Sequence, residues 1–256
     1  MYIHLLHLGR VSFAEGLAIQ QRVIAARKQN LIGDTLLLLE HPPVLTLGRN
    51  AHRSNVIVSD EFLRQRGIEL HEINRGGDVT YHGPGQLVGY PIMDLRGDFP
   101  GKKGPHLGPV DFVRMLEEAL IRTCGDFGVL AKRISKCTGV WTFGGGEFAD
   151  ADVHGRTPER KLAAIGVHVS QGVTSHGFAL NVTTDLRDFD WIVPCGITDR
   201  QVTSLELEAD SARQPTFENA LNSTARNFGR IFERQILWSE SLDKLLHPQN
   251  KTKEPV

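Results

Sequence analysis

The segment 190–200, DWIVPCGITDR, places a cysteine between a proline and a glycine. Apolar residues precede it, and Pro194 and Gly196 favour a turn at Cys195. A side chain on a turn at the end of a packed segment can be both held in place and exposed. A nucleophilic cysteine needs both properties, together with a neighbouring group that stabilises its thiolate. Cysteines on turns are more often structural, so this segment alone makes Cys195 a candidate nucleophile and no more.

Four side chains elsewhere could stabilise that thiolate, namely Lys161, His82, His168 and His176. Histidine is the commoner partner of a catalytic cysteine, so the residues alone favour His82 or His176. A lysine at the start of a strand is usually solvated, but beside an acidic group it can serve in proton transfer. A zinc site is not expected, because the sequence has no CxxC pair and no nearby histidine at ligand spacing from Cys195.

The segment 74–91, NRGGDVTYHGPGQLVGYP, is rich in glycine. Gly76 and Gly77, and the later run Gly83-Pro84-Gly85, allow the backbone to approach a ligand closely. The glycine spacing fits neither a Walker A motif nor a dinucleotide fingerprint, since no GK[ST] follows. A glycine-rich hairpin with solvated charges explains the segment equally well.

Hydrophobic periodicity and turn residues predict the elements that must position these groups. The predicted helices span residues 12–29, 59–66, 110–127 and 215–232. The predicted strands span residues 2–8, 35–39, 44–47, 68–73, 140–141, 162–169 and 177–182. Cys124 falls on the apolar stripe of the helix 110–127, which predicts a core position. Because strands and helices do not alternate regularly, a single α+β (α/β) domain is favoured over a doubly wound sheet.

Composition narrows the class of protein. The chain has 256 residues, 40% of them hydrophobic, and a formal net charge of -1. This charge gives no general electrostatic case for nucleic acid or a membrane surface. Three cysteines, an odd number, argue against a disulfide framework. No secretory signal peptide is expected at the first residues. Together these features predict a cytoplasmic protein of a reducing compartment.

Three blocks of the sequence resemble the signature blocks of lipoyl(octanoyl) transferases. They are RGGDVTYHGPGQLVGYP, KLAAIGVHVSQGVTSHGFALNV and FDWIVPCGI, within residues 75–91, 161–182 and 189–197. The segments LLLEHPPVLTLGR and VTSL are also similar, so the resemblance runs roughly from Leu36 to Leu205. It implies transfer of an octanoyl or lipoyl group from acyl carrier protein to a lysine of a lipoyl domain. It also implies the fold shared by lipoate-protein ligases and biotin ligase catalytic domains.

The resemblance assigns roles that the residues alone left open. It implies that Cys195 is the nucleophile and that Lys161 is its acid/base partner. The acyl pocket that it implies is lined by three segments: Arg75, Gly76, Gly77, Asp78, Val79, Thr80, Tyr81 and His82; Ala164, Ile165 and Gly166; and Gly177, Phe178 and Ala179. No metal, nucleotide or organic cofactor is implied, because a thioester donor is already activated.

The implied donor is octanoyl-acyl carrier protein. The implied acceptors are the lipoyl domains of 2-oxoacid dehydrogenase complexes and the glycine cleavage H protein. Such partners are generally acidic, so we expect a basic docking surface. Its candidates are Arg49, Arg53, Arg75 and Arg160.

Residues 1–246 are expected to form one catalytic domain, and residues 247–256 a disordered tail. Residues 142–160 are expected to form a surface insert, longer than the turn usual in the family. Two alternatives remain. An ATP-dependent lipoate-protein ligase would share the fold and the lysine but would not need Cys195. A non-catalytic acyl-binding module would need neither residue for chemistry.

Overall fold

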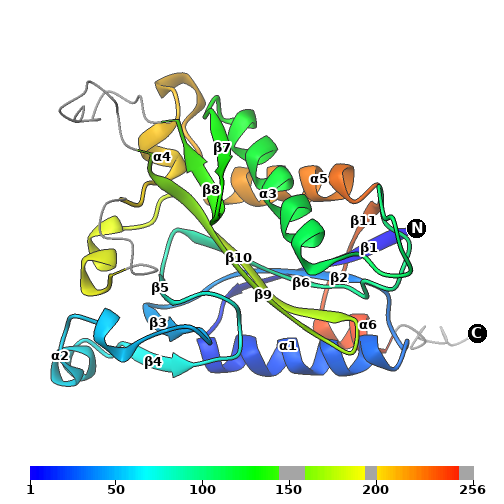
Figure 1. The fold of residues 1–256 in the computed structure, drawn as a ribbon, viewed down its shortest axis with the longest axis horizontal. Coiled ribbons are helices and arrows are strands. Elements are labelled where there is room, and N and C mark those ends of the chain that lie inside the picture. The colour runs from blue at the N-terminus through cyan, green and yellow to red at the C-terminus, as the bar shows by residue number, and fades with distance from the viewer. Residues whose placement is uncertain (144–158, 194–200, 248–256) are drawn as a thin grey trace, which may run out of the picture.

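The computed structural model describes residues 1–143, 159–193 and 201–247. Its centre is an eight-stranded sheet with the order β11-β1-β2-β6-β10-β9-β8-β7 (Figure 1). The strands are β1 (Tyr2–Arg10), β2 (Thr35–Glu40), β6 (Gln86–Ile92), β7 (Ala131–Ile134), β8 (Cys137–Thr142), β9 (Lys161–Ser170), β10 (Val173–Asn181) and β11 (Gln235–Trp238). Strand β1 runs parallel to both β2 and β11, and the other neighbouring strands are antiparallel.

Helices cover both faces of this sheet. Helices α3 (Pro109–Asp126) and α5 (Phe217–Ile231) pack on one face, and α1 (Phe13–Lys28) and α6 (Leu242–Leu246) pack on the other (Figure 1). On α3, fully buried Phe112, Leu116, Leu120 and Cys124 recur every four residues, so they form one apolar stripe toward the sheet. No helix among the described residues combines the length and apolar character needed to cross a membrane.

A second, three-stranded sheet has the order β4-β3-β5. Its strands are β3 (Val44–Leu47), β4 (Glu69–Glu72) and β5 (Val79–His82). The short helices α2 (Asp60–Gln65), η1 (Arg53–Asn55) and η2 (Leu186–Trp191) lie around it, and Leu45, Leu63 and Phe189 belong to its core. Two further short helices, α4 (Leu205–Glu208) and η4 (Ser211–Arg213), precede α5.

The three long predicted helices are confirmed to within about two residues. Side-chain capping explains where α1 begins, since the hydroxyl oxygen of Ser12 accepts a hydrogen bond from the Glu15 N–H at 3.2 Å. Ser59 likewise caps α2 by accepting from the Phe62 N–H, and Gly67 follows that helix with a φ of +64°. The predicted core position of Cys124 is confirmed, because its side chain is fully buried.

The hairpin interpretation of residues 74–91 is wrong. Strand β5 pairs with β3, whereas β6 pairs with β2 and β10, so the two strands belong to different sheets. The turn at Gly83-Pro84-Gly85 carries the chain from one sheet to the other. Strands β7 and β11 and helix α6, each of four or five residues, were not predicted. Residues 144–158 of the expected insert, and 248–256 of the expected tail, lie outside the described residues.

Candidate active site

A cavity of about 280 Å³ is bounded by residues of both sheets. Strands β6, β9 and β10 of the large sheet supply one side. The loop before β5, with β5 itself, supplies the facing side, and Phe13 at the start of α1 reaches it as well. The volume is close to the lower end of small-molecule pockets, about 300–1,000 Å³.

The structure brings nearly all of the predicted pocket residues together around this cavity. Those that line it are Arg75, Gly76, Gly77, Asp78, Val79, Thr80, His82, Ala164, Ile165, Gly166, Gly177, Phe178 and Ala179. Their part in substrate binding stays a prediction.

Tyr81 is the predicted pocket residue that does not line the cavity. Its hydroxyl donates a hydrogen bond to the Asp188 carboxylate at 2.5 Å, and its ring packs edge-on against Phe189 and Trp191. Burial, followed by the Asp188 contact, raises the pKa of the Tyr81 hydroxyl. Side chains alternate along a strand, so Tyr81 points away from its neighbours Thr80 and His82 and toward η2.

Small side chains form the sheet wall of the cavity. In the ladder between β9 and β10, Ala164 pairs with Ala179 and Gly166 pairs with Gly177. The glycine loop lies directly over this wall, since the Gly76 N–H donates to the carbonyl oxygen of Val167 at 3.2 Å. A Cβ atom at Gly166 would lie 2.6 Å from the Gly76 carbonyl oxygen. Gly166 therefore permits the close contact between the wall and the loop.

The side chain of Arg75 joins the glycine loop to strand β3. The residue is only 9% exposed. Its Nη2 donates to the Thr46 carbonyl oxygen at 2.8 Å and to the Thr46 hydroxyl at 2.9 Å, which joins the loop to β3. The expectation that Arg75 belongs to an exposed docking surface is therefore wrong.

Lys161 is the first residue of β9 and lines the cavity. Its side-chain nitrogen lies 4.8 Å from the centre of the Trp141 ring. Trp141 is buried, and its indole N–H donates to the Cys137 carbonyl oxygen at 3.1 Å, which fixes the ring. The Lys161 N–H donates to the Gln201 carbonyl oxygen at 2.9 Å, so the chain after residue 200 returns beside this lysine.

Cys195, the predicted nucleophile, lies within residues 194–200, outside the described residues. The described chain before that segment is held in place, because the Val193 N–H donates to the Asn55 carbonyl oxygen at 2.7 Å. The side-chain amide of Asn55 in turn donates to the Asp78 carboxylate, at 2.7 Å, in the loop that lines the cavity.

His82 and His176, the two histidines that the residues alone favoured as thiolate partners, both line the cavity, whereas the third candidate, His168, is not among its lining residues. Burial, followed by the nearby His41, lowers the pKa of His82 to about 3. Burial, followed by the Arg75 charge, lowers the pKa of His176 to about 4. Both imidazoles are therefore neutral and weakly basic near pH 7, which argues against either as the proton acceptor.

Hydrogen bonds connect His82 with Lys161 across the floor of the cavity. The chain begins with the His82 Nδ1–H donating to the Gln86 side-chain oxygen at 2.7 Å. The Gln86 amide donates to Asn181 at 3.0 Å, and the Asn181 amide donates to the Thr203 carbonyl oxygen at 2.9 Å. The Thr203 N–H then donates to the Lys161 carbonyl oxygen at 2.9 Å. These amides fix the tautomer of His82 and join the polar end of the cavity to the backbone of Lys161.

Several lining residues were not singled out from the sequence. Gln86, Val88 and Tyr90 alternate along β6 and share the cavity face. Their i, i+2 spacing could have indicated a common face. Phe13 carried no such signal, because α1 meets the cavity only in the tertiary structure. In the described ranges, no group of three or more His, Cys, Asp or Glu side chains could hold a metal ion.

Comparison with known proteins decides the family. Residues 12–229 match the family model described as "Lipoyl protein ligase A/B catalytic domain". The chain belongs to this family. It is 61% identical over 246 residues to an octanoyltransferase of Acidobacterium capsulatum, with 96% of each chain covered. It is 51% identical to an octanoyltransferase of Koribacter versatilis, covering 95% of this chain and 90% of that one.

Solved structures support the same fold. The crystal structure of lipoate-protein ligase A bound with ATP superposes with a TM-score of 0.68, at 17% identity, over 97% of this chain and 94% of that one. At this identity the likeness concerns the fold alone. The predicted mixed α/β domain and the predicted resemblance to octanoyltransferases are confirmed.

Proposed function

We propose that the chain transfers an octanoyl or lipoyl group from acyl carrier protein to a lysine of lipoyl domains, through a thioester on Cys195. Relatives named octanoyltransferase that are up to 61% identical support the transfer. The cavity supports the acyl substrate, because its wall of Ala164, Gly166 and Ala179 offers small side chains to a straight apolar chain.

The observation that carries the catalytic assignment is the position of Lys161. It lines the same cavity as the small-residue wall, and its backbone bonds to Gln201. Cys195 precedes Gln201 by six positions (201 − 195 = 6), so the segment with the proposed nucleophile leads directly to this lysine.

The proposed reaction has two steps, which are acylation of Cys195 and transfer of the acyl group to the acceptor lysine. Lys161 accepts the thiol proton of Cys195, and the thiolate attacks the carbonyl carbon of the octanoyl thioester. The bond between that carbon and the carrier sulfur breaks, and the carrier thiolate takes the proton from Lys161. The acceptor amine then attacks the acyl-enzyme, Lys161 accepts the proton of the amine, and the Cys195 thiolate leaves.

The reaction needs no ATP, which separates it from the alternatives. We expect purified protein, octanoyl-acyl carrier protein and a lipoyl domain to give octanoylated lipoyl domain without ATP. Modification only with free octanoate and ATP would identify a ligase. Tight binding of octanoyl carrier without product in either mixture would identify a binding module.

The covalent route has its own test. After incubation with octanoyl carrier alone, peptide mass spectrometry should find an octanoyl thioester on Cys195 and none on Cys124, which is fully buried. Cys195→Ala should abolish both the adduct and the transfer. Full turnover by that variant would rule out the acyl-enzyme.

The proposed partners and compartment follow from this chemistry. Lipoyl domains of 2-oxoacid dehydrogenase complexes and the glycine cleavage H protein are the proposed acceptors. A reducing cytoplasm is the proposed compartment, since it keeps a catalytic thiol available. Cys124 and Cys137 are both free thiols.

A further inference from the structure

A largely buried ion pair lies beside Lys161. The Nη2 of Arg160 lies 2.8 Å from the Glu208 carboxylate, and the two side chains are 12% and 6% exposed. Breaking a buried pair by removing one partner is strongly destabilising, because the other charge is left uncompensated. A pair of this kind therefore holds its two backbone segments firmly together.

Glu208 also binds the segment on the other side of Lys161. The Thr203 hydroxyl donates to the same Glu208 oxygen at 2.6 Å. The Thr203 N–H donates to the Lys161 carbonyl oxygen at 2.9 Å. One carboxylate at the end of α4 therefore connects the residue before Lys161 with the chain that pairs with Lys161.

The first residues of β9 are fixed on their other edge by β8. The Thr142 N–H donates to the Arg160 carbonyl oxygen at 2.9 Å, and the Arg160 N–H donates to the Thr142 hydroxyl at 3.1 Å. The backbone at Lys161 thus enters the sheet between β8 and residues 201–203. The carboxylate of Glu208 joins two of these three segments through side chains.

We propose that Glu208 is a positioning residue for the transfer reaction, which sets the backbone of Lys161 against residues 201–203. The inference rests on the proposed function, in which Lys161 moves protons. Reacting groups must be placed closely, since a displacement of about 1 Å can lower the rate about a hundredfold. Glu208 acts through Arg160 and Thr203, so its loss should lower kcat more than it raises KM.

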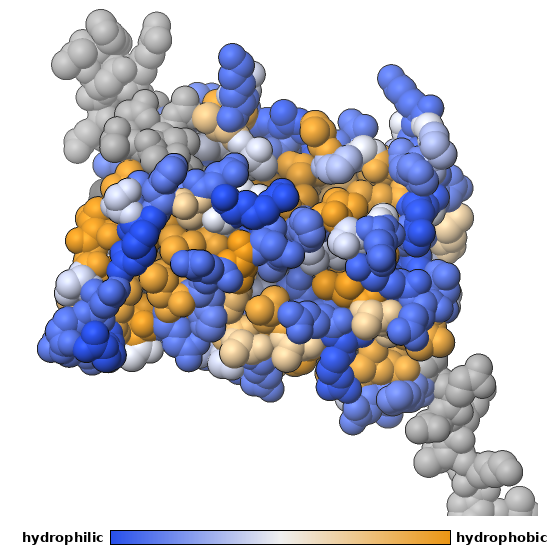
Figure 2. All heavy atoms as spheres, turned by 60° about the horizontal axis from the view of Figure 1, so that its bottom comes forward, coloured by the Kyte–Doolittle hydropathy of each residue, from blue (hydrophilic) through white to orange (hydrophobic). Residues whose placement is uncertain are grey.

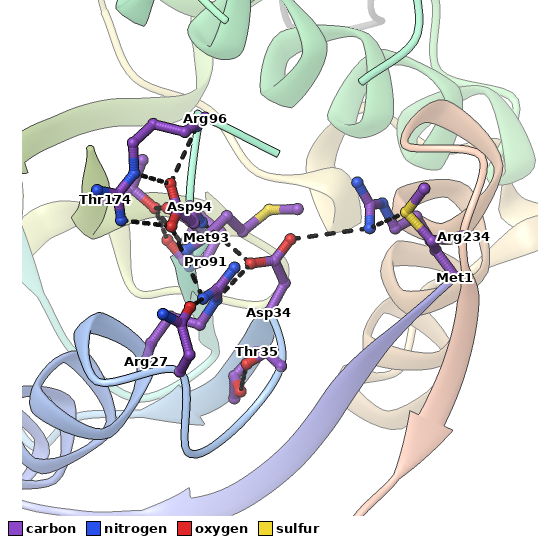
Figure 3. Close-up of polar contacts among 12 residues, drawn as sticks. Met1, Arg27, Asp34, Thr35, Pro91, Met93, Asp94, Arg96, Thr174 and Arg234 are labelled. Carbon is purple, nitrogen blue, oxygen red and sulfur yellow. Dashed lines mark hydrogen bonds and ion pairs between the residues drawn. The ribbon is translucent and has the colours of Figure 1, made fainter. Parts of the chain in front are cut away.

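The chain offers a matched control in a second, largely buried ion pair. Arg27 Nε lies 2.8 Å from the Asp34 carboxylate, with side chains 14% and 6% exposed. Asp94 and Arg234 lie near the same pair, and Figure 3 shows these side chains around Asp34. Neither Arg27 nor Asp34 lines the cavity. Substitution of Asp34 should therefore cost stability without moving Lys161.

The experiment compares Glu208→Ala with Asp34→Ala in the full-length protein. We would measure the melting temperature and the single-turnover acylation of Cys195 by a small octanoyl thioester, which removes carrier docking from the rate. Both variants should melt earlier than the parent. Glu208→Ala should acylate about tenfold to a hundredfold more slowly with KM little changed, whereas Asp34→Ala should keep the parental rate.

Two conservative variants complete the test. Glu208→Gln keeps an oxygen that accepts from Thr203, so its rate should recover much of what Glu208→Ala loses. Thr203→Val removes the hydroxyl contact but keeps the N–H bond to Lys161, and should also slow acylation. Equal rate losses in Glu208→Ala and Asp34→Ala would overturn the proposal, as would a glutamine variant no better than alanine. If Glu208→Ala does not fold, an unchanged rate in Thr203→Val overturns it.

Lys161→Met separates this inference from the proposed function. If Lys161→Met keeps full activity, the proposed role of the lysine fails. If Lys161→Met is inactive while Glu208→Ala behaves like Asp34→Ala, only the positioning role fails.

Discussion

At the scale of single residues, the environment of Lys161 differs sharply from that of the cavity histidines. The Lys161 nitrogen faces the ring of Trp141, and the face of an indole attracts a cation. His82 and His176 are buried and kept neutral. Two neutral imidazoles therefore line the same cavity as Lys161, and the predictions below test Lys161 and His82 in turn.

The first prediction concerns activation of the thiol by Lys161. An ordinary thiol titrates near pH ~8.5, and a neighbouring cation lowers this value. With Cys124 and Cys137 replaced by serine, Lys161→Met should move the midpoint of Cys195 alkylation to higher pH. Lys161→Arg should keep part of the thiolate stabilisation but lose turnover, because arginine does not release its proton. An unmoved midpoint in Lys161→Met would remove the lysine from thiol activation.

The second prediction concerns acid stability. The folded pKa of His82 is about 3, below the usual value near 6.5, so protons bind the unfolded chain first as the pH falls. The loss of unfolding free energy caused by this proton binding is absent above pH ~7 and grows to about 2 kcal/mol at pH 5. His82→Gln should therefore flatten the loss of unfolding free energy between pH 7 and 5. Urea titrations at pH 7 and pH 5 measure the unfolding free energy of each protein. An equal change in that free energy between the two pH values for parent and variant would contradict the burial of His82.

At the scale of elements, the cavity exists because β9 and the glycine loop approach closely. The Gly76 N–H bonds to β9 at Val167, and Gly166 leaves room for the Gly76 carbonyl oxygen. Arg75 ties the loop to β3 of the small sheet. The cavity shape thus depends on contacts between the two sheets as well as on the side chains that line it.

The third prediction follows from that contact. In Gly166→Val the new Cβ meets the Gly76 oxygen, so the loop must move or the cavity must narrow. Overfilling a packed site costs about 1–3 kcal/mol, and we expect a shift in preference from octanoyl toward hexanoyl donors. Competition between the two donors measures the shift. Gly125→Ala is the control, since a Cβ there meets no atom within 4 Å. An unchanged octanoyl preference in Gly166→Val would mean that the wall lies elsewhere.

Elements marked by local sequence patterns could be predicted from the sequence, whereas those set by tertiary contacts could not. The stripe of Leu116, Leu120 and Cys124 and the cap at Ser12 are local patterns, so α3 and α1 were predicted closely. The resemblance, not a local pattern, assigned Ala164, Ile165 and Gly166 to the pocket, and in the structure all three line the cavity. The side-chain orientations of Tyr81 and Arg75 depend on β5 and β6 joining different sheets. Tertiary contacts decide this, and no local sequence pattern specifies it. A short segment such as Gln235–Trp238 becomes a strand only because β1 offers it a partner.

At the scale of the whole molecule, hydrophilic and hydrophobic residues are interspersed over the face in Figure 2. Of the four candidate docking arginines, Arg75 is buried, and the Arg160 side chain is only 12% exposed and is paired with Glu208. Arg53 pairs with Asp60. Arg49 is exposed, and its N–H bonds to the Arg75 carbonyl oxygen at 3.0 Å, which places it beside the cavity loop.

The fourth prediction assigns docking to Arg49. Arg49→Gln should raise KM for octanoyl carrier about twofold to tenfold and leave a small octanoyl thioester unaffected, because exposed charges act over about 8 Å at physiological salt. Added salt should reduce this difference. Arg122→Gln is the control, since its exposed side chain lies on α3, across the sheet from α1. Equal effects of the two substitutions would count against a docking face at Arg49.

The pairing of β1 with β11 can form only late in the synthesis of the chain. Tyr2 lies opposite Gln235, so these partners are 235 − 2 = 233 positions apart. At about 5–20 residues per second, a ribosome needs about 10–50 s to pass from one to the other. Throughout that interval one edge of β1 has no partner, and its buried Ile3 and Leu5 lack their final cover. An open strand edge is a template for wrong pairing. The nascent chain is thus most prone to aggregation before β11 emerges, and messages truncated before codon 235 should yield insoluble product.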